Sequence, residues 1–399
     1  MRNGWFDSAW FESVAEAERR ARRRLPAGVY SSLVAGAQRG ATLADNVAAF
    51  GEIGFAPRTA GGTGTPALGR RVLGLDLAFP VLVAPTGVQA VHPDAEPGLA
   101  RAAAARGTAL CLSDFASRPV EEVVAAAPGT LFQVHWAGGR EGVLARAERA
   151  RRAGAAGLVV TLDWSFSSGR DHGSPYVPER VDQHAVRRYA LQVAARPRWL
   201  AGWLRAGGPP ALTAPNMTAD PAQPAPSFLA AYRAWQAGPR PGWDDVAWLR
   251  ERWDGPFLVK GVVRADEARR AADAGATAVS VSNHGGNNLD GTPAALRALP
   301  AVAEAVGDRV EVLLDGGVRR GSDVAAALAL GARAVMVGRA ALWGLAAEGQ
   351  AGVENVLDLL RDGLTSTLVA LGHASVDDLS RDDLVVPPGF ERRLGTGGR

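Results

Sequence analysis

A histidine in the segment Ser282-Asn283-His284-Gly285-Gly286 is the residue best suited to act as a general base. Histidine has an ordinary pKa near neutrality, so it can accept a proton at physiological pH. Asp163 would orient the ring, because a histidine held by a carboxylate is the usual form of a tuned base. The two glycines after His284 would leave room for a ligand. A lone histidine is more often structural, so the inference depends on the elements that position it.

Lys260 is the only lysine among 44 basic residues. A compact ammonium is not interchangeable with a guanidinium. Either an arginine-rich chain happened to keep one lysine, or this position needs an ammonium. Because Lys260 ends an apolar segment, we favour the second interpretation.

Short apolar runs alternate with alanine-rich amphipathic segments, the pattern of βα units. The eight predicted strands are 81–86, 109–113, 131–136, 157–163, 257–261, 278–283, 310–315 and 334–338. Helix-length segments between them are 97–106, 140–153, 265–274 and 322–330. Near-continuous apolar strands suit a parallel sheet covered on both faces. Eight of them predict a closed (β/α)8 TIM barrel, which fits 399 residues as a single domain with extensions.

Two segments lie outside this rhythm. Residues 1–80 form an N-terminal extension, with a helix expected at 13–25, a second segment at 29–37 and then a loop rich in Gly, Thr and Pro. Residues 170–245 form a long insertion after the fourth strand, irregular over 209–226. An insertion there lies over the active-site face, so a lid or a subunit contact is expected. The alternative is a disordered loop, against which its tryptophans argue.

Polar residues stand at the carboxyl end of every predicted strand, where barrels of this kind carry their chemistry. They are Thr86, Ser113, Gln133 with His135, Thr161 with Asp163, Lys260, Ser282 with His284, Asp315 and Arg339. A purely structural barrel would not need a polar residue at each of these ends. The agreement across strands is therefore stronger evidence than any single motif.

The loops after strands seven and eight carry a phosphate-binding pattern. Asp315-Gly316-Gly317-Val318-Arg319 follows the seventh strand, and Gly338-Arg339 follows the eighth. Barrels often bind phosphate with these two loops, through backbone N–H groups and a helix N-terminus. Glycines allow close approach, and an arginine can hold two phosphate oxygens.

Composition excludes several other classes. The net charge of +3 and the dispersed arginines predict neither a nucleic-acid partner nor a membrane partner. A single cysteine, Cys111, excludes an internal disulfide, and no signal-peptide core or apolar span of about 18 residues is found, so a cytoplasmic protein is expected. The chain has no HExxH or paired-cysteine pattern, so no metal is expected.

These motifs closely resemble the FMN-dependent 2-hydroxy-acid oxidases and dehydrogenases, over nearly the whole chain. The matching segments are 42–43, 85–86, 112–113, 258–261, 282–286, 289–291, 315–321 and 338–344, with Asn46, Phe50, Gln133, Thr161 and Asp163. The resemblance implies an FMN cofactor, a small-molecule substrate, oxygen or an electron carrier as acceptor, and a homo-oligomer, a tetramer or an octamer.

The resemblance also implies roles for individual residues. His284 would take the substrate proton while hydride equivalents pass to flavin N5, and Asp163 would support the imidazolium. Lys260 would lie near flavin N1 and O2. The isoalloxazine and ribityl contacts would come from Pro85, Thr86, Gly87, Ser113, Gln133, Thr161 and Ser282, and the ribityl and phosphate contacts from Asp315, Gly316, Gly317, Arg319, Gly338 and Arg339.

The substrate side departs from the family. Asn287 stands where hydroxy-acid enzymes carry the arginine that clamps the substrate carboxylate, and asparagine cannot make that charged bidentate pair. The other replaced or unsettled substrate positions are Ser32, Phe115, His135 and Arg170. The flavin side is kept while the carboxylate side is lost, which suggests a substrate other than a hydroxy acid.

A narrower group explains this pattern. Segments 30–33, 54–57, 85–93, 163–166 and 283–293 resemble the flavin oxidases of mycofactocin biosynthesis. These oxidise a small lactam amine, derived from the C-terminal Val-Tyr of a ribosomal peptide, to an imine that hydrolyses to a keto-lactam and ammonia, with oxygen reduced to peroxide. In that group tyrosine is usual where this chain has His135.

Two alternatives stay open at this point. One is an FMN-dependent 2-hydroxy-acid oxidase or dehydrogenase with atypical carboxylate recognition, through Arg170. The other is a catalytically silent flavin-binding barrel, against which the pairing of His284 with Asp163 argues because a pure binder needs neither residue.

Overall fold

The computed structural model describes residues 11–34, 36–60, 64–163, 169–171 and 173–396. The matched segment 164–166 lies outside the described residues. Within the described part, no helix combines the length and apolarity that a bilayer crossing would require.

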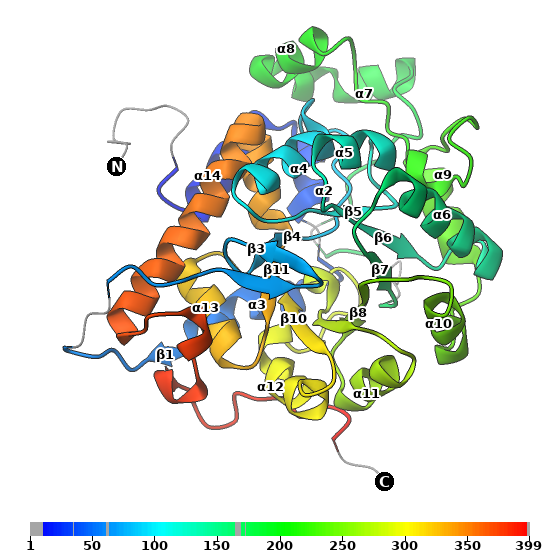
Figure 1. The fold of residues 1–399 in the computed structure, drawn as a ribbon. Helices are drawn as coiled ribbons and strands as arrows, with labels where there is room; N and C mark the ends of the chain where they lie inside the picture. The colour runs from blue at the N-terminus through cyan, green and yellow to red at the C-terminus, as the bar shows by residue number, and fades with distance from the viewer. Residues whose placement is uncertain (1–10, 35, 61–63, 164–168, 172, 397–399) are drawn as a thin grey trace.

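Eight parallel strands form the predicted barrel (Figure 1). They are β4 (Val81–Val83), β5 (Cys111–Ser113), β6 (Leu131–His135), β7 (Leu158–Thr161), β8 (Phe257–Val262), β9 (Ala278–Val281), β10 (Glu311–Asp315) and β11 (Ala334–Val337). From β5 to β11 each strand pairs with the next along the chain, and β11 returns to pair with β4. The remaining gap is closed by a parallel bridge between Val83 and Leu110. The (β/α)8 prediction is confirmed.

Helices surround the barrel because each βα unit must cover the outer face of its strand. They are α4 (Ala95–Ala105), α5 (Val120–Ala126), α6 (Gly139–Ala153), α10 (Trp243–Arg250), α11 (Ala265–Asp273), α12 (Ala295–Val306), α13 (Gly321–Ala329) and α14 (Arg339–Leu371). The sequence predicted α4, α6, α11 and α13 to within two residues of their starts and one of their ends. Gly154, with φ +90°, ends α6 at the glycine stop expected before β7.

The interior of the barrel is closed at its amino end by a hairpin that the sequence did not reveal. Strands β2 (Arg70–Val72) and β3 (Leu75–Leu77) pair antiparallel through a turn at Leu73 and Gly74, both with positive φ. Val72 and Leu77 join the buried cluster inside the barrel, which includes Cys111. We expected a loop here. The two strands are only three residues long, too short for an alternating pattern to appear.

The N-terminal extension contributes three helices, α1 (Val14–Arg24), α2 (Ala27–Val34) and α3 (Ala41–Gly51). The predicted first helix is confirmed, and the Ser13 side chain caps it by accepting from Glu16 N. Helix α1 packs along α14, and α3 packs beside the His284 loop. Strand β1 (Gly54–Phe55) pairs antiparallel with β12 (Leu384–Val385), which joins the N-terminal extension to a segment beyond α14.

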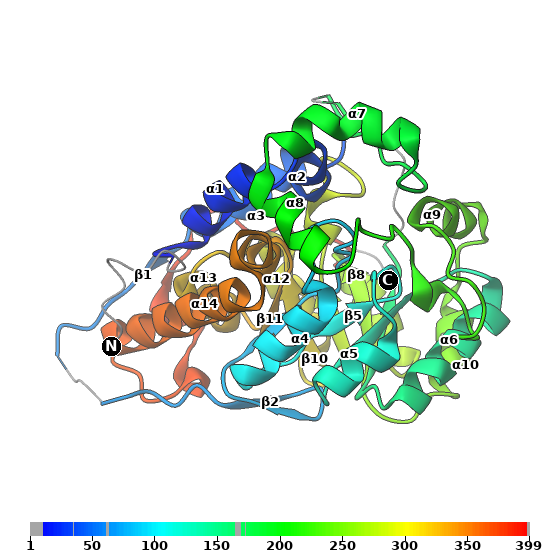
Figure 2. The same ribbon diagram turned by 90° about the horizontal axis from the view of Figure 1, so that it is seen from above.

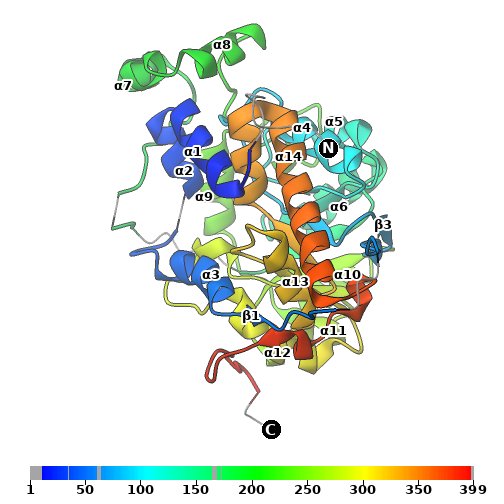
Figure 3. The same ribbon diagram turned by 90° about the vertical axis from the view of Figure 1, so that its left-hand side faces the viewer.

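The insertion after β7 is largely helical. It contains α7 (Gln183–Ala194), α8 (Pro197–Arg205), a 3₁₀ turn at Pro215–Met217 and α9 (Phe228–Ala237). Helices α7 and α8 stand at the edge of the molecule, away from the barrel (Figures 1 and 3). Helix α9 lies closer to the barrel than α7 does (Figure 2), and its Trp235 ring lies 4.7 Å from the His135 ring at the end of β6. The described part of the insertion is therefore mainly helical rather than one disordered loop. Its 209–226 segment is mostly irregular, as predicted.

Candidate active site

His284 and Asp163 meet at the carboxyl end of the barrel. His284 Nδ1 lies 3.2 Å from Asp163 Oδ2 and 3.3 Å from Oδ1. The imidazole side chain is about one third exposed, whereas Asp163 is mostly buried. The carboxylate therefore holds the Nδ1 proton and leaves Nε2 as the ring atom able to accept a proton from a substrate. The pairing expected from the sequence is confirmed.

The His284 loop owes its shape to left-handed backbone at three successive residues. His284 has φ +55°, Gly285 +64° and Gly286 +81°. A non-glycine residue in this region costs about 1–3 kcal/mol, and such strain is commonest at functional sites. We had expected the two glycines to leave room for a ligand, but they do not. A Cβ at Gly286 would lie 2.6 Å from Leu43 N, and one at Gly285 would meet the Arg339 guanidinium.

The charge on Asp163 is secured by its surroundings. Burial alone would raise the pKa of the carboxyl, but the charge and hydrogen bond of His284, with Lys260 and His135 nearby, outweigh it and lower the pKa. Asn288 Nδ2 also donates to Asp163 Oδ2 at 3.0 Å. Asp163 is therefore an ionised, fixed partner for the base over the physiological range.

Lys260 lies at the centre of a buried polar network. Its Nζ lies 3.1 Å from Asp315 Oδ2 and donates to Ser282 Oγ at 2.8 Å. Asp315 also accepts from Ser280 Oγ and Ser282 Oγ, each at 2.8 Å. Burial opposes the ammonium, but the charges of Asp315 and Asp163 outweigh it and raise the pKa of Lys260. The position holds a permanent positive charge inside the barrel, which supports the functional interpretation of the only lysine.

The expected flavin-side residues line the same end of the barrel. Ser113 Oγ donates to Gln133 Oε1 at 2.9 Å across the β5–β6 pair, which fixes the amide of Gln133. Thr86 has a buried hydroxyl without a hydrogen-bond partner among the described residues. Buried hydroxyls are rarely left unpaired, so this hydroxyl is a candidate hydrogen-bond partner for a ligand. Strand pairing places Thr161 beside both His135 and Lys260, and Pro85 and Gly87 flank Thr86.

Two arginines after β10 and β11 form a cationic site. Burial lowers the pKa of Arg319 and, with the charge of Arg319, lowers that of Arg339 to about 10. Both side chains stay partly accessible. Arg339 Nη1 donates to Val34 O and Arg319 Nη1 to Val318 O, and neither guanidinium has an ion pair within the described part of the chain. The charges of Glu18 and Asp323 lie near this site, but two neighbouring guanidinium groups without a direct ion pair fit a phosphate group.

The glycines of these loops serve packing as well. Gly316 and Gly317 have φ of +106° and +88°, and a Cβ on Gly317 would lie 1.8 Å from Asn46 O in α3. Gly338 precedes Arg339 at the start of α14. Together with the unpaired Thr86 hydroxyl, the Lys260 ammonium and the two arginines, the residues present fit an FMN, whose phosphate would be held by the β10 and β11 loops.

Asn287 does not face the site as a free polar group. Its Oδ1 accepts from Gly36 N at 2.9 Å, and its Nδ2 donates to His284 O at 2.8 Å. The side chain therefore ties the His284 loop to the N-terminal extension. This is a different role from the substrate contact that we expected of it.

Asn287→Arg is expected to destabilise the fold by about 1–3 kcal/mol, because a guanidinium cannot accept from Gly36 N and leaves that group unpaired. It should not by itself create hydroxy-acid oxidation. Thermal unfolding against Leu289→Arg, which adds the same charge at an exposed position of the same loop, measures the effect. Equal stability of the two variants would contradict this role.

Two other expected substrate residues lie towards the rim. Ser32 is exposed on α2, and its hydroxyl donates to Val29 O in the same helix. No hydrogen bond within the described part of the chain connects it with His284. Arg170 is half-buried and donates to Ser31 O at 3.4 Å. Burial lowers the pKa of Arg170, and the nearby Tyr232 opposes that shift.

Phe115 and His135 pack against aromatic residues of α9, and these rings together form an aromatic wall at the carboxyl end of the barrel. Phe115 lies 5.6 Å from Phe228 and 5.9 Å from Trp235, ring centre to ring centre. His135 lies 4.7 Å from Trp235 and 6.4 Å from His284. Helix α9 thus brings the insertion against the catalytic end of the barrel, and its aromatic residues were missed in the sequence because they lie about 100 residues from their partners.

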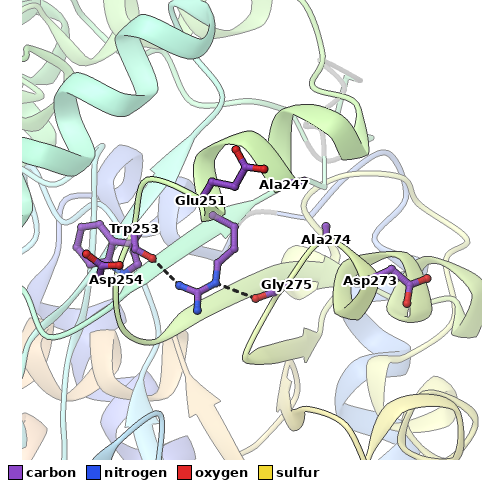
Figure 4. Close-up of a pocket in the computed structure, with 8 residues that line it drawn as sticks. Ala247, Glu251, Trp253, Asp254, Asp273, Ala274 and Gly275 are labelled. Carbon is purple, nitrogen blue, oxygen red and sulfur yellow. Dashed lines mark hydrogen bonds between the residues drawn. The ribbon is translucent and has the colours of Figure 1, made fainter.

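Two surface depressions lie elsewhere. One of about 430 Å³ is lined by Arg250, Trp253 and Gly275, with Arg250 donating to the carbonyls of the other two (Figure 4). Another of about 440 Å³ is lined by Arg70, Gly307 and Arg333. Both are formed by loops that lead into strands, at the amino end of the barrel. Chemistry in this fold occurs at the opposite end, so neither is the active site.

Comparison with known proteins identifies the family. Residues 21–386 match the model of the FMN-dependent dehydrogenases. The chain is 60% identical over 391 residues to pre-mycofactocin synthase of Mycobacterium tuberculosis (strain CDC 1551 / Oshkosh), covering 98% of both chains. It is 38% identical to glycolate oxidase 3 of Arabidopsis thaliana, covering 92% of this chain and 94% of the relative.

The fold agrees with these relatives. The crystal structure of (S)-mandelate dehydrogenase, described as a monotopic membrane protein, superposes with a TM-score of 0.85 at 31% identity, covering 94% of this chain and 100% of that one. With the histidine–aspartate pair, the buried lysine and the phosphate-type arginines in place, the chain belongs to the FMN-dependent dehydrogenase family and is an FMN-dependent oxidoreductase.

Proposed function

We propose that the enzyme oxidatively deaminates a small lactam amine derived from the Val-Tyr end of a peptide. The substrate R₂CH–NH₂ reacts with O₂ and H₂O to give the keto-lactam R₂C=O, NH₃ and H₂O₂. The amine carbon loses two electrons and becomes an imine carbon, water then replaces the nitrogen, and oxygen is reduced to peroxide. The 60% identity to a protein named pre-mycofactocin synthase supports this choice within the family.

The single observation that carries the proposal is the loss of a carboxylate clamp beside His284. Hydroxy-acid members carry an arginine where this chain has Asn287, and both polar atoms of Asn287 are occupied by backbone groups. A carboxylate would therefore find no guanidinium from this loop. A lactam amine has no carboxylate and needs none.

The aromatic wall adds a second argument. A lactam made from valine and tyrosine carries an aromatic ring. The rings of Phe115, Phe228, Tyr232 and Trp235 lie 5.5–6.3 Å from their neighbours, centre to centre, and would offer edges and faces for it to pack against. Such pairs contribute about 0.5–1.5 kcal/mol each beyond burial of their area. The wall would orient the amine carbon towards His284 and exclude water from it.

In this reaction the protein would position the substrate, and the flavin, when bound, would supply the redox chemistry as the acceptor of a hydride equivalent from the amine carbon. His284 Nε2 would accept the proton released from nitrogen, and Asp163 would stabilise the resulting imidazolium. Lys260 would offset negative charge that develops on the cofactor. Arg319 and Arg339 would hold its phosphate.

A product assay tests the proposal. Aerobic incubation of the purified yellow protein with the lactam amine is expected to give keto-lactam, ammonia and hydrogen peroxide in equal amounts. Glycolate, lactate and mandelate should give no peroxide under the same conditions. Peroxide formed from a simple hydroxy acid at a rate similar to that from the amine would overturn the assignment.

One observation favours a second candidate, an FMN-dependent 2-hydroxy-acid oxidase. Arg170 is half-buried, lies near Tyr232 of α9, and has no ion pair among the described residues. It would serve as the carboxylate partner in place of the missing arginine. The hydroxy-acid arm of the product assay, repeated with Arg170→Met, decides between the two functions.

A further inference from the structure

A second imidazole–carboxylate pair stands beside the catalytic one. His135 Nδ1 lies 2.7 Å from Asp114 Oδ1, and the backbone N of His135 donates to Asp114 Oδ2 at 2.8 Å. Asp114 is fully buried and His135 is 6% exposed. Both carboxylate oxygens are thus spent on one residue, which holds this ring more tightly than the 3.2 Å contact holds His284.

The contacts of His135 define which nitrogen is free. A carboxylate only accepts hydrogen bonds, so the contact with Asp114 places the ring proton on Nδ1. Gln133 Nε2 is 3.0 Å from the same nitrogen but cannot donate to it once it carries that proton. Nε2 has no hydrogen-bond partner among the described residues and, in the neutral ring, presents a lone pair.

The setting of this lone pair is aromatic and charge-balanced. Phe115 and Trp235 flank the ring at 4.9 and 4.7 Å. Behind it, Arg146 Nε lies 3.9 Å from Asp114 Oδ2. Asp114 thus lies between His135 and Arg146, and its carboxylate would face the imidazolium that forms when His135 gains a proton.

The remaining titratable groups that face His135 come from β7, β9 and α9. They are Asp163, whose ionisation His135 favours, His284 at 6.4 Å between ring centres, and Tyr232, which packs on Trp235 and Phe115. One small molecule can therefore touch both histidines. A lone pair backed by a carboxylate attracts an N–H donor or an ammonium and repels a carboxylate.

We propose that His135, positioned by Asp114, binds the substrate's ammonium group and takes its extra proton. One N–H bond of R₂CH–NH₃⁺ breaks, the proton passes to His135 Nε2, and the electron pair stays on nitrogen. The result is a neutral amine beside His284 and an imidazolium held by Asp114. The inference rests on the proposed function, since it requires an amine substrate. It assigns the ammonium proton to His135 and leaves the proton of the neutral amine to His284.

The pH dependence of kcat/KM for the holoenzyme with the lactam amine tests this assignment. If His135 takes the proton, the wild-type enzyme uses the ammonium form, and kcat/KM stays level for some distance below the substrate's own pKa. His135→Gln must instead wait for free amine, which falls about tenfold per pH unit below that pKa. Two units below it, the variant is expected to lag by about 100-fold more than it does above it.

A binding measurement gives a readout separate from turnover. The probe is the lactam amine with a methyl group in place of the hydrogen on its amine carbon, which cannot be oxidised. Calorimetry in two buffers of different ionisation enthalpy should show no proton release to the buffer with wild-type holoenzyme and about one proton with His135→Gln. Asp114→Asn, which keeps the ring, should shift both readouts in the same direction and guards against a folding failure of the first variant.

The matched control is His373→Gln. His373 and Asp383 form another buried imidazole–carboxylate pair, at 2.8 Å, beyond the C-terminal end of α14 and away from the carboxyl ends of the strands. This variant should keep the wild-type pH profile. Amine turnover by His135→Gln with the wild-type profile and no proton release would overturn the inference while leaving the proposed function intact. Turnover of hydroxy acids instead of the amine by the wild-type enzyme would overturn both.

Discussion

Replacing His284 by asparagine is expected to lower kcat by about 10²–10⁴-fold while the protein stays yellow, because proton removal by a positioned base is commonly worth that factor. The geometry that supports this is the 3.2 Å contact with Asp163 and the partly exposed ring at the carboxyl end of β9. Steady-state turnover of the lactam amine, with the flavin spectrum recorded on the same samples, measures the two effects separately.

Asp163→Asn should act in the same direction, because it removes the charge that stabilises the imidazolium. The pKa of Asp163 is lowered in the folded protein, so its stabilising contribution is present above the ordinary aspartate pKa and is lost as pH falls through the lowered value. Asp163 should therefore not limit turnover between pH 5 and 8. His184→Asn, on the exposed face of α7, is the control, and a His284 variant with unchanged kcat would remove the proposed base.

Arg319→Met is expected to weaken FMN binding by about 30- to 4,000-fold, since loss of one partner from a desolvated charge pair costs about 2–5 kcal/mol. The same change should stabilise the flavin-free protein. Burial lowers the pKa of this guanidinium more than the charges of Glu18 and Asp323 raise it. The side chain donates to Val318 O and has Arg339 as a neighbouring cation. Removing a charge that the fold holds at a cost raises the free energy of unfolding.

Because Arg319→Met should weaken FMN binding but stabilise the flavin-free protein, the two effects together distinguish a phosphate-binding role from a structural one. FMN titration gives the affinity, and thermal unfolding without added flavin gives the stability. Arg320→Met is the matched control, because Arg320 is the next residue in the loop and is exposed; it should change neither quantity appreciably. Weaker FMN binding together with a less stable flavin-free protein would show that Arg319 supports the fold rather than a phosphate.

Much of the fold could be predicted because barrel strands are apolar on both faces and end in polar residues. The glycine at the end of α6 and the apolar run of β9 both show in the sequence at their correct places. The β2–β3 hairpin could not be predicted, since three-residue strands carry no periodicity and their burial depends on a barrel assembled from the rest of the chain.

Some residues of the site could likewise be predicted from the sequence, and others could not. Residues whose roles follow from strand ends and glycine loops, such as Lys260 and Arg339, could be placed from the sequence. Asp114 was missed because an aspartate after an apolar run looks like a loop residue, and its partner His135 is 21 residues away. The glycines after His284 were interpreted as space for a ligand, although Leu43 of α3 and the Arg339 guanidinium fill that space.

Asn287 changed most between sequence and structure. In the sequence, Asn287 stands where the resemblance predicts an arginine, and this remains the reason to expect a substrate without a carboxylate. In the fold it is also a brace between Gly36 and His284 O. Installing the arginine alone therefore does not restore a hydroxy-acid site, because the brace is lost at the same time.

Anaerobic mixing of the purified holoenzyme with candidate substrates tests the central claim most directly. The absorbance of the oxidised flavin should disappear on mixing with the lactam amine and persist with lactate, glycolate and mandelate. Rapid loss of that absorbance with any of the three hydroxy acids, and none with the amine, would contradict the account.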